Sequence, residues 1–272
     1  MLLSQETVTN NYKVFYPKTS SPKAVCMVIH GLNQKPSTMQ WVINKLLNQG
    51  AIVVNVELWG HGNNPIPNSD TAQVEKRLTQ FKQVTWMQWM DDTKPALKFI
   101  TETCAENNLP KFFFGFSLGA LVGSSISMDI DFEFDKYFLL APAIEIKLWP
   151  RVFIGLLSPF PKMVVRSRTP VAYRENQGTP VSAYKALLKG AKKFRKEQPN
   201  INNCLIIVDK KDRLVSPKKL KRFAEQQNYS IAIIDKRKMS CKYCDVGHLV
   251  IDDESLGEYS KFVSDEISAF FK

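Results

Sequence analysis

The stretch from Lys111 to Ser125, KFFFGFSLGALVGSS, is the feature that most constrains how this chain can fold. An apolar run leads into Gly115-Phe116-Ser117-Leu118-Gly119, and small residues suited to a close-packed helix follow. This order predicts a strand, a sharp turn and a helix, with a serine at the apex of the turn. A serine in such a turn has strained backbone angles and little room on either side, so glycines at 115 and 119 are what the geometry requires. The pattern therefore predicts a nucleophile elbow that presents the Ser117 hydroxyl above the end of a sheet.

Strand-like and helix-like segments alternate along the rest of the chain. Residues 6–16 predict an edge hairpin around Asn10-Asn11. Short apolar runs predict buried strands at 25–29, 51–56, 134–140, 204–208 and 231–234, and helical spacing predicts helices at about 38–50, 85–104, 217–227 and 253–271. Ser37 or Thr38 is the expected cap of the first helix, and Pro95 predicts a kink or a fresh helix start in the second. The order is that of an α/β protein with a mostly parallel sheet and helices on both faces.

Residues 143–200 interrupt this alternation. Their first half is rich in aromatic residues and prolines, and their second half predicts a strongly basic helix from Val181 to Glu197. Because the sheet needs the chain on both sides of it, we interpret 143–200 as a cap inserted into one core made of 1–142 and 201–272. Its expected position is over the strand ends where Ser117 lies.

A serine hydroxyl is a poor nucleophile until a base removes its proton, and the chain has three histidines. His30 and His61 lie in glycine-flanked turns before Ser117, whereas His248 follows the last predicted strand. We therefore favour His248 as the base. For His61 we favour a hydrogen-bonded surface histidine, and for the turn after His30 a loop whose backbone amide faces a developing oxyanion.

The base needs a carboxylate that fixes its tautomer. Asp209 and Asp212 both follow the strand predicted at 204–208. Asp212 extends further into the loop and leads directly to the next helix, so it is preferred to Asp209, for which a turn role is the alternative. Asp245 is a third candidate, but it lies so close to His248 in sequence that a role in its own loop is expected.

These motifs together resemble a known family. The elbow, His30-Gly31-Leu32, Gly60-His61-Gly62, the DRLVSP segment that starts at Asp212, and Gly247-His248 resemble the α/β-hydrolase superfamily, in particular its monoacylglycerol lipase, lysophospholipase and serine aminopeptidase branch. The resemblance covers about 24–142 and 204 to the end, and it leaves the cap out.

The resemblance implies a fold, an activity and site residues. The implied fold is an α/β-hydrolase sheet with a helical cap insertion. Ser117 would be the nucleophile, Asp212 the acid and His248 the base, with the backbone N–H groups of Leu32 and Leu118 as the oxyanion hole. The implied enzyme is a serine carboxylic ester hydrolase of the lysophospholipase or monoacylglycerol lipase kind, which needs no cofactor or metal.

The apolar cap is the guide to the substrate. It holds more apolar side chains than a loop over a polar site would need, so we expect Trp149, Phe153 and Leu156 to help line an acyl pocket. The alternative is that many of them only seal the cap to the sheet. The expected substrate is a small acyl ester or lipid. An acyl thioester or a small peptide would use the same groups, and a non-catalytic membrane-associated binding protein on this fold is the rival from another class.

The net charge of +11 raises the question of an anionic partner. Basic residues cluster on the helix at 181–197 and again between residues 210 and 222, where a solvated face is the alternative to contact with an anionic membrane. Nucleic acid is not expected, because these helices have no interleaved aromatic residues and no nucleic-acid motif. The oligomeric state is left open.

The five cysteines are odd in number, and three of them lie in apolar patterns typical of reduced, buried thiols. The N-terminal residues have no basic start and no apolar signal core, so we expect a cytoplasmic protein. The remaining pair, Cys241 and Cys244, raises the alternatives of a zinc ligand pair or a redox switch beside His248. A single C-x-x-C is weak support for either.

Overall fold

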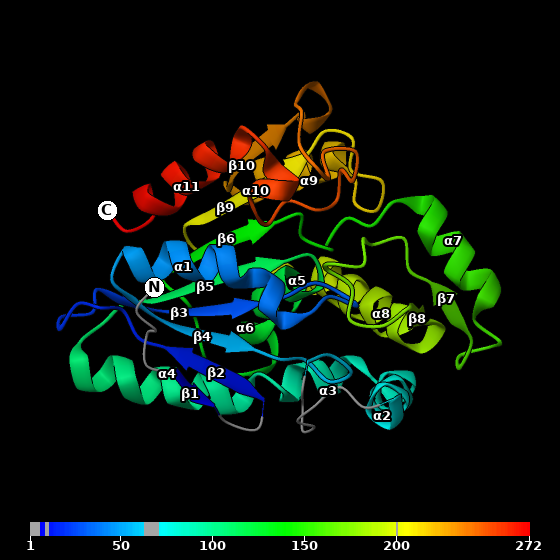
Figure 1. Ribbon diagram of the computed structural model, residues 1–272, viewed down its shortest axis with the longest axis horizontal. Coiled ribbons are helices and arrows are strands. Elements are labelled where there is room, and N and C mark those ends of the chain that lie inside the picture. The colour runs from blue at the N-terminus through cyan, green and yellow to red at the C-terminus, as the bar shows by residue number, and fades with distance from the viewer. Residues whose placement is uncertain (1–5, 9–10, 63–70, 200) are drawn as a thin grey trace.

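An eight-stranded sheet forms the centre of the protein in the computed structural model, which describes residues 6–8, 11–62, 71–199 and 201–272 (Figure 1). In spatial order the strands are β1-β2-β4-β3-β5-β6-β9-β10. β2 is antiparallel to β4, and the pairs from β4 to β10 are all parallel, so the predicted α/β class is confirmed. The strand bounds are β1 (Glu6–Val8), β2 (Tyr12–Phe15), β3 (Ala24–Ile29), β4 (Ala51–Val56), β5 (Lys111–Phe116), β6 (Lys136–Leu140), β9 (Cys204–Asp209) and β10 (Ser230–Ile234).

Helices cover both faces of the sheet because its strands alternate between two cores. In β3, Val25 and Met27 join one apolar cluster, whereas Cys26 and Val28 join the other. The first core is covered by α2 (Thr71–Gln83), α3 (Trp86–Asp91), α4 (Lys94–Asn107), α5 (Leu118–Ser124), α6 (Ile126–Asp129), α8 (Val181–Glu197) and α9 (Pro217–Gln227). The second is covered by the 3-10 turn η1 (Pro36–Met39), α1 (Gln40–Asn48), α10 (Asp253–Leu256) and α11 (Tyr259–Ala269).

Several predicted helix and strand boundaries are confirmed. Thr85 caps α3 through its side chain, and Pro95 lies in the first turn of α4, which is the fresh helix start expected there. Ser216 caps α9, and β1 pairs antiparallel with β2 as the edge hairpin requires. The turn residue Asn10 lies outside the described residues.

Two helix predictions are wrong in detail. The first helix is preceded by η1, so Met39 rather than Ser37 or Thr38 precedes α1, and no side chain caps it. The closing helix is split in two, because Gly257 at φ +57° ends α10 before α11 begins. Asp252 caps α10 in a capping box with Ser255.

The segment between β6 and β9 lies beyond the carboxyl ends of the parallel strands, at the right of Figure 1. It holds α7 (Leu148–Leu157), the two-stranded hairpin β7 (Val164–Arg166) and β8 (Gly178–Pro180), and α8. The sequence predicts α8 but neither α7 nor the hairpin. Pro150 lies in the first turn of α7, where a missing N–H costs nothing. Among the described residues, every helix is too short or too polar to cross a bilayer.

Replacement of Gly123 by alanine is expected to destabilise the fold. A Cβ at Gly123 would lie 1.9 Å from the buried ring of Phe113, so α5 could no longer pack on β5. Such overpacking costs about 1–3 kcal/mol of unfolding free energy. Gly155 in α7 is the matched control, because its added Cβ meets no atom within 4 Å. Urea unfolding should show Gly155→Ala as stable as the parent or about 0.5–1 kcal/mol more stable; equal effects at both positions would contradict the packing argument.

Candidate active site

Ser117 lies at the tight turn between β5 and α5 with φ +51° and ψ −108°, a conformation that residues other than glycine rarely adopt. The neighbouring glycines make this turn possible. A Cβ at Gly119 would lie 2.3 Å from the carbonyl oxygen of Ile29, and one at Gly115 would lie 2.6 Å from Cα of Ala120. The Ser117 N–H donates to the carbonyl of Leu140 at 2.9 Å, which ties the turn to the end of β6.

The structure brings Ser117, His248 and Asp212 together from three separate loops. His248 Nε2 lies 2.8 Å from Ser117 Oγ, and His248 Nδ1 lies 2.7 Å from Asp212 Oδ2. Because an ionised carboxylate only accepts, Nδ1–H donates to Asp212 and leaves the Nε2 lone pair for the serine hydroxyl. Asp212 Oδ1 accepts the N–H groups of Leu214 and Val215 at 2.7 and 3.0 Å, which fixes the carboxylate within its own loop.

The other two carboxylates lie elsewhere. Asp209 accepts the backbone N–H of Lys211 at 2.6 Å and that of Lys236 at 2.9 Å, so it holds two loops in the manner of a turn residue. Asp245 is exposed. Of the three candidates, Asp212 is the one whose carboxylate contacts His248.

A buried lysine supports the histidine loop, and the sequence analysis missed it. The Lys236 ammonium donates to the backbone carbonyls of Val246, Leu249 and Ser255, two of which flank His248. Burial lowers the pKa of Lys236 to about 8, although nearby aspartates oppose the shift. Its Lys-Arg-Lys setting is typical of a surface turn, so only the folded chain distinguishes it from its neighbours.

The loop Gly31-Leu32 lies against the elbow. A Cβ at Gly31 would meet the ring of Phe116 at 2.7 Å, and that ring lies 5.3 Å from the ring of His248. The N–H of Gly31 donates to Gln34 Oε1 at 2.8 Å. In the part of the chain that the structure describes, no protein acceptor is recorded for the N–H groups of Leu32 and Leu118. Both therefore suit a developing oxyanion, which is the role expected of them.

His30 and His61 form a buried pair behind this loop, with ring centroids 4.7 Å apart. His61 Nε2 accepts the N–H of Asn33 at 2.8 Å, and His30 Nε2 accepts that of Leu58 at 3.2 Å. Burial lowers the pKa of both, to about 4 for His30, so both rings are neutral near pH 7. His61 is therefore a buried support of the loop rather than a surface histidine.

The three predicted pocket residues lie on one helix, α7. Trp149 and Leu156 are 61% and 74% exposed, and Phe153 is half-buried with its ring 5.3 Å from that of Trp149. No helix was predicted at 148–157, so no outward helix face could be assigned to these residues. Between Ile144 and Phe160, the apolar residues that join the core are Ile144 and Ile146.

Cys241 and Cys244 are joined by a disulfide that packs against Gly257. Bonded sulfurs are not thiolate ligands, and within the described ranges no group of three or more metal-binding side chains comes together. The redox switch stays a prediction. Cys26, Cys104 and Cys204 are free and buried, as their apolar settings predict.

The His30 pKa predicts how stability changes with pH. The pKa of His30 is 6.5 in the unfolded chain and about 4 in the folded protein. As the pH drops from 6.5 to 4, the unfolded chain therefore takes up a proton that the folded protein does not, and the unfolding free energy falls. His30→Gln keeps one donor and one acceptor but does not titrate. Urea unfolding between pH 7 and 4.5 should give the variant a shallower decline than the parent, with His61 still contributing; parallel declines would refute the assignment.

Comparisons with known proteins place the chain in a family. The family model for serine aminopeptidase, S33, a group of hydrolases, matches residues 20–234. No curated protein sequence matches the chain. Among solved structures, a soluble variant of the monoglyceride lipase from Saccharomyces cerevisiae is 11% identical with a TM-score of 0.74, covering 100% of this chain and 96% of its own.

Two further structures agree with that fold. A monoacylglycerol lipase from Paleococcus ferrophilus is 16% identical with a TM-score of 0.60, covering 94% of this chain and 98% of its own. A thermostable carboxyl esterase from Bacillus coagulans is 14% identical with a TM-score of 0.64, covering 99% and 98%. Identities this low support the fold alone, whereas the family model spans most of the sequence. The chain therefore belongs to the serine aminopeptidase S33 family of α/β-hydrolases.

Proposed function

We propose that this protein is a serine ester hydrolase that cleaves small acyl esters through an acyl-enzyme on Ser117. The observation that carries the proposal is the continuous chain of contacts from Ser117 Oγ through His248 to the buried Asp212 carboxylate. The non-catalytic alternative would be expected to lack one of these groups. The family match also names hydrolases.

The proposed reaction has two halves. His248 Nε2 takes the proton of Ser117 as Oγ attacks the ester carbonyl, and the imidazolium is stabilised by Asp212. The oxyanion accepts the N–H groups of Leu32 and Leu118, and the imidazolium then protonates the leaving alcohol. A water activated by His248 attacks the acyl-enzyme, releases the carboxylic acid and restores Ser117.

Esters are favoured over peptides by the charge of the segment above the site. Between Glu145 and Glu175 the chain carries six basic residues and no acidic one, and Glu175 is already paired with Arg77, so this stretch favours an ester over a peptide with a terminal ammonium. The small-peptide hydrolase named by the family stays the second candidate.

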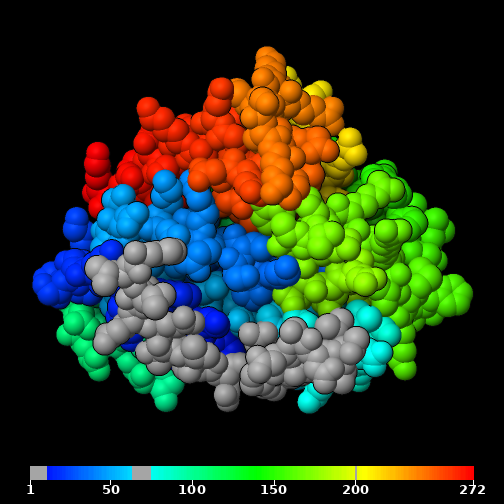
Figure 2. Space-filling view, viewed as in Figure 1, coloured from blue at the N-terminus to red at the C-terminus, as the bar shows by residue number. Residues whose placement is uncertain are grey.

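We propose residues 143–200 as the cap of the core formed by 1–142 and 201–272. Figure 2 draws its yellow-green surface directly against the blue surface of the loop after β3.

The catalytic proposal predicts a chain-length preference and a dependence on the triad. A panel of p-nitrophenyl esters from acetyl to decanoyl should be hydrolysed, with the longer acyl groups preferred. Ser117→Ala and Asp212→Asn should each lower kcat by about 10⁴-fold. Asp245→Asn is the matched control, since Asp245 is exposed and outside the contact chain, and should keep the parental rate within about threefold. Parental turnover by Ser117→Ala would exclude the mechanism.

We further propose that the cap contacts an anionic membrane and that the enzyme is cytoplasmic. Exposed apolar side chains on and after α7 are interspersed with cations such as Arg151 and Lys162, a combination suited to an anionic lipid surface. The exposed apolar residues of this cap surface are Leu148, Trp149, Val152, Leu156, Phe160, Met163, Val164 and Val171. The three buried free thiols support a reducing compartment, where a disulfide such as Cys241–Cys244 is usually redox-active rather than structural.

Vesicle sedimentation tests the membrane contact. The parent should bind vesicles containing phosphatidylserine more tightly than vesicles of phosphatidylcholine alone. Trp149→Ser with Leu156→Ser should weaken binding by about tenfold or more, because two large exposed apolar side chains are removed. Met87→Ser on α3, also an exposed apolar position, should bind like the parent. Equal loss in both variants, or no preference for anionic lipid, would count against this surface.

A further inference from the structure

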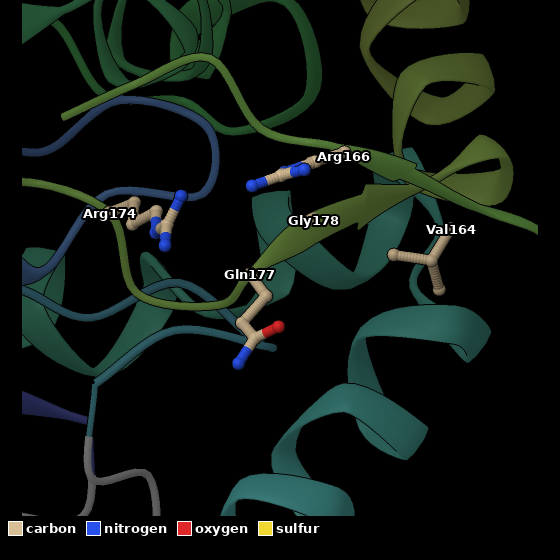
Figure 3. Close-up of a pocket in the computed structure, with 5 residues that line it drawn as sticks. All are labelled: Val164, Arg166, Arg174, Gln177 and Gly178. Atoms are coloured by element: carbon tan, nitrogen blue, oxygen red, sulfur yellow. The ribbon is translucent and has the colours of Figure 1, made fainter. Parts of the chain in front are cut away.

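Two arginines of the cap converge on one cavity. The cavity has a volume of about 490 Å³ and is lined by Val164, Arg166, Arg174, Gln177 and Gly178. In Figure 3 the guanidinium groups of Arg166 and Arg174 point toward one another across the open space, and the Gln177 amide lies below them. Arg166 and Gly178 are register partners in the β7–β8 hairpin, so the hairpin itself forms one wall.

Among the residues that the structure describes, these two positive charges have no carboxylate partner. No acidic residue lines the cavity, and across the described residues neither guanidinium has a recorded side-chain hydrogen bond or ion pair. The nearest carboxylate in sequence, Glu175, is paired with Arg77 of α2. Two like charges held toward each other repel, and an anion between them removes the repulsion. The cavity is therefore chemically suited to a group with negative charge.

The cavity is joined to the oxyanion loop by the backbone. Arg174 forms an antiparallel bridge with Gln34, the residue whose side chain accepts the N–H of Gly31. Next to it, the Asn33 amide donates to the carbonyl of Asn176 at 3.0 Å and accepts its N–H at 2.9 Å. Asn33 and Asn176 are both buried. The segment that carries Arg174 is therefore fixed directly to the loop that carries the Leu32 N–H, and an anion bound by Arg174 is positioned relative to that loop.

A phosphate group fits these donors best. Guanidinium forks bind phosphate oxygens in pairs, and a phosphomonoester carries up to two negative charges, which match two arginines. We propose that Arg166, Arg174 and Gln177 form a subsite for the phosphate of an acylglycerol phosphate, whose acyl ester is cleaved at Ser117. The inference rests on the proposed ester hydrolase and names its substrate class, a lysophospholipid rather than a neutral glyceride.

A matched pair of substrates tests the subsite. Decanoylglycerol and decanoylglycerol 3-phosphate, both below their micelle-forming concentrations and without vesicles, differ only in the phosphate. The parent should have a higher kcat/KM for the phosphate ester. In Arg166→Met with Arg174→Met, the ratio of the two kcat/KM values should fall by about tenfold or more, since hydrogen bonds to a charged group are lost. Arg166→Lys, which keeps the charge but not the fork, should lie between.

Arg168→Met is the control, because Arg168 is an exposed cation of the same segment that does not line the cavity. Its ratio should equal that of the parent. A parental ratio near one, an equal loss for both substrates, or the same fall in Arg168→Met would overturn the proposal.

Calorimetry with inorganic phosphate separates the subsite from catalysis. Ser117→Ala should bind phosphate, and the further exchange of Arg166 and Arg174 for methionine should abolish that binding. Phosphate binding without any effect on the substrate ratio would overturn the assignment to substrate and leave free phosphate or membrane lipid as its source. If the parent does not hydrolyse p-nitrophenyl esters either, the proposed function fails. The calorimetry then still decides whether the anion subsite exists, because it needs only the loss of phosphate binding in the arginine variant.

Discussion

The strained backbone of Ser117 is the constraint on which the rest of the site depends. Positive φ at a residue with a side chain costs of the order of 1–3 kcal/mol, so it persists only where the surroundings impose it. Here the ends of β3 and β6 do so, through the close approach of Gly119 to Ile29 and the hydrogen bond to Leu140. The strain fixes the direction of the hydroxyl, and every other group of the site is placed relative to it.

Buried polar groups hold the two loops that meet this hydroxyl. Lys236 binds carbonyls on both sides of His248, and the neutral pair His30 and His61 holds the loop around Leu32. An unpaired buried donor or acceptor is costly, so each such group restricts its loop to the arrangement that satisfies it. The geometry of the proposed catalytic groups is thus fixed before a substrate binds, which is how preorganised donors lower a barrier most effectively.

Residues 143–200, the proposed cap, are joined to the same loop by hydrogen bonds. The reciprocal amide pair of Asn33 and Asn176 and the bridge from Gln34 to Arg174 connect this segment to the loop that carries Leu32. The outer face of α7 is apolar and exposed, whereas the cavity under the β7–β8 hairpin is cationic. In the proposed function, this segment would separate a surface suited to lipid from a cavity suited to an anionic head group.

The sequence by itself determined the sheet, the elbow and the candidates for each role. Glycines around Ser117, strand-length apolar runs and a serine before Pro217 are local signals, because backbone sterics and capping act over a few residues. Tertiary structure decided which candidates meet. Asp209 ends β9 and Asp212 follows in the next loop, so the two are close in sequence. In the fold, Asp212 contacts His248, whereas Asp209 accepts the N–H of Lys236, which follows the neighbouring strand β10. The same holds for the outward face of α7 and for the paired arginines, since contacts between distant segments depend on chain packing that no local pattern records.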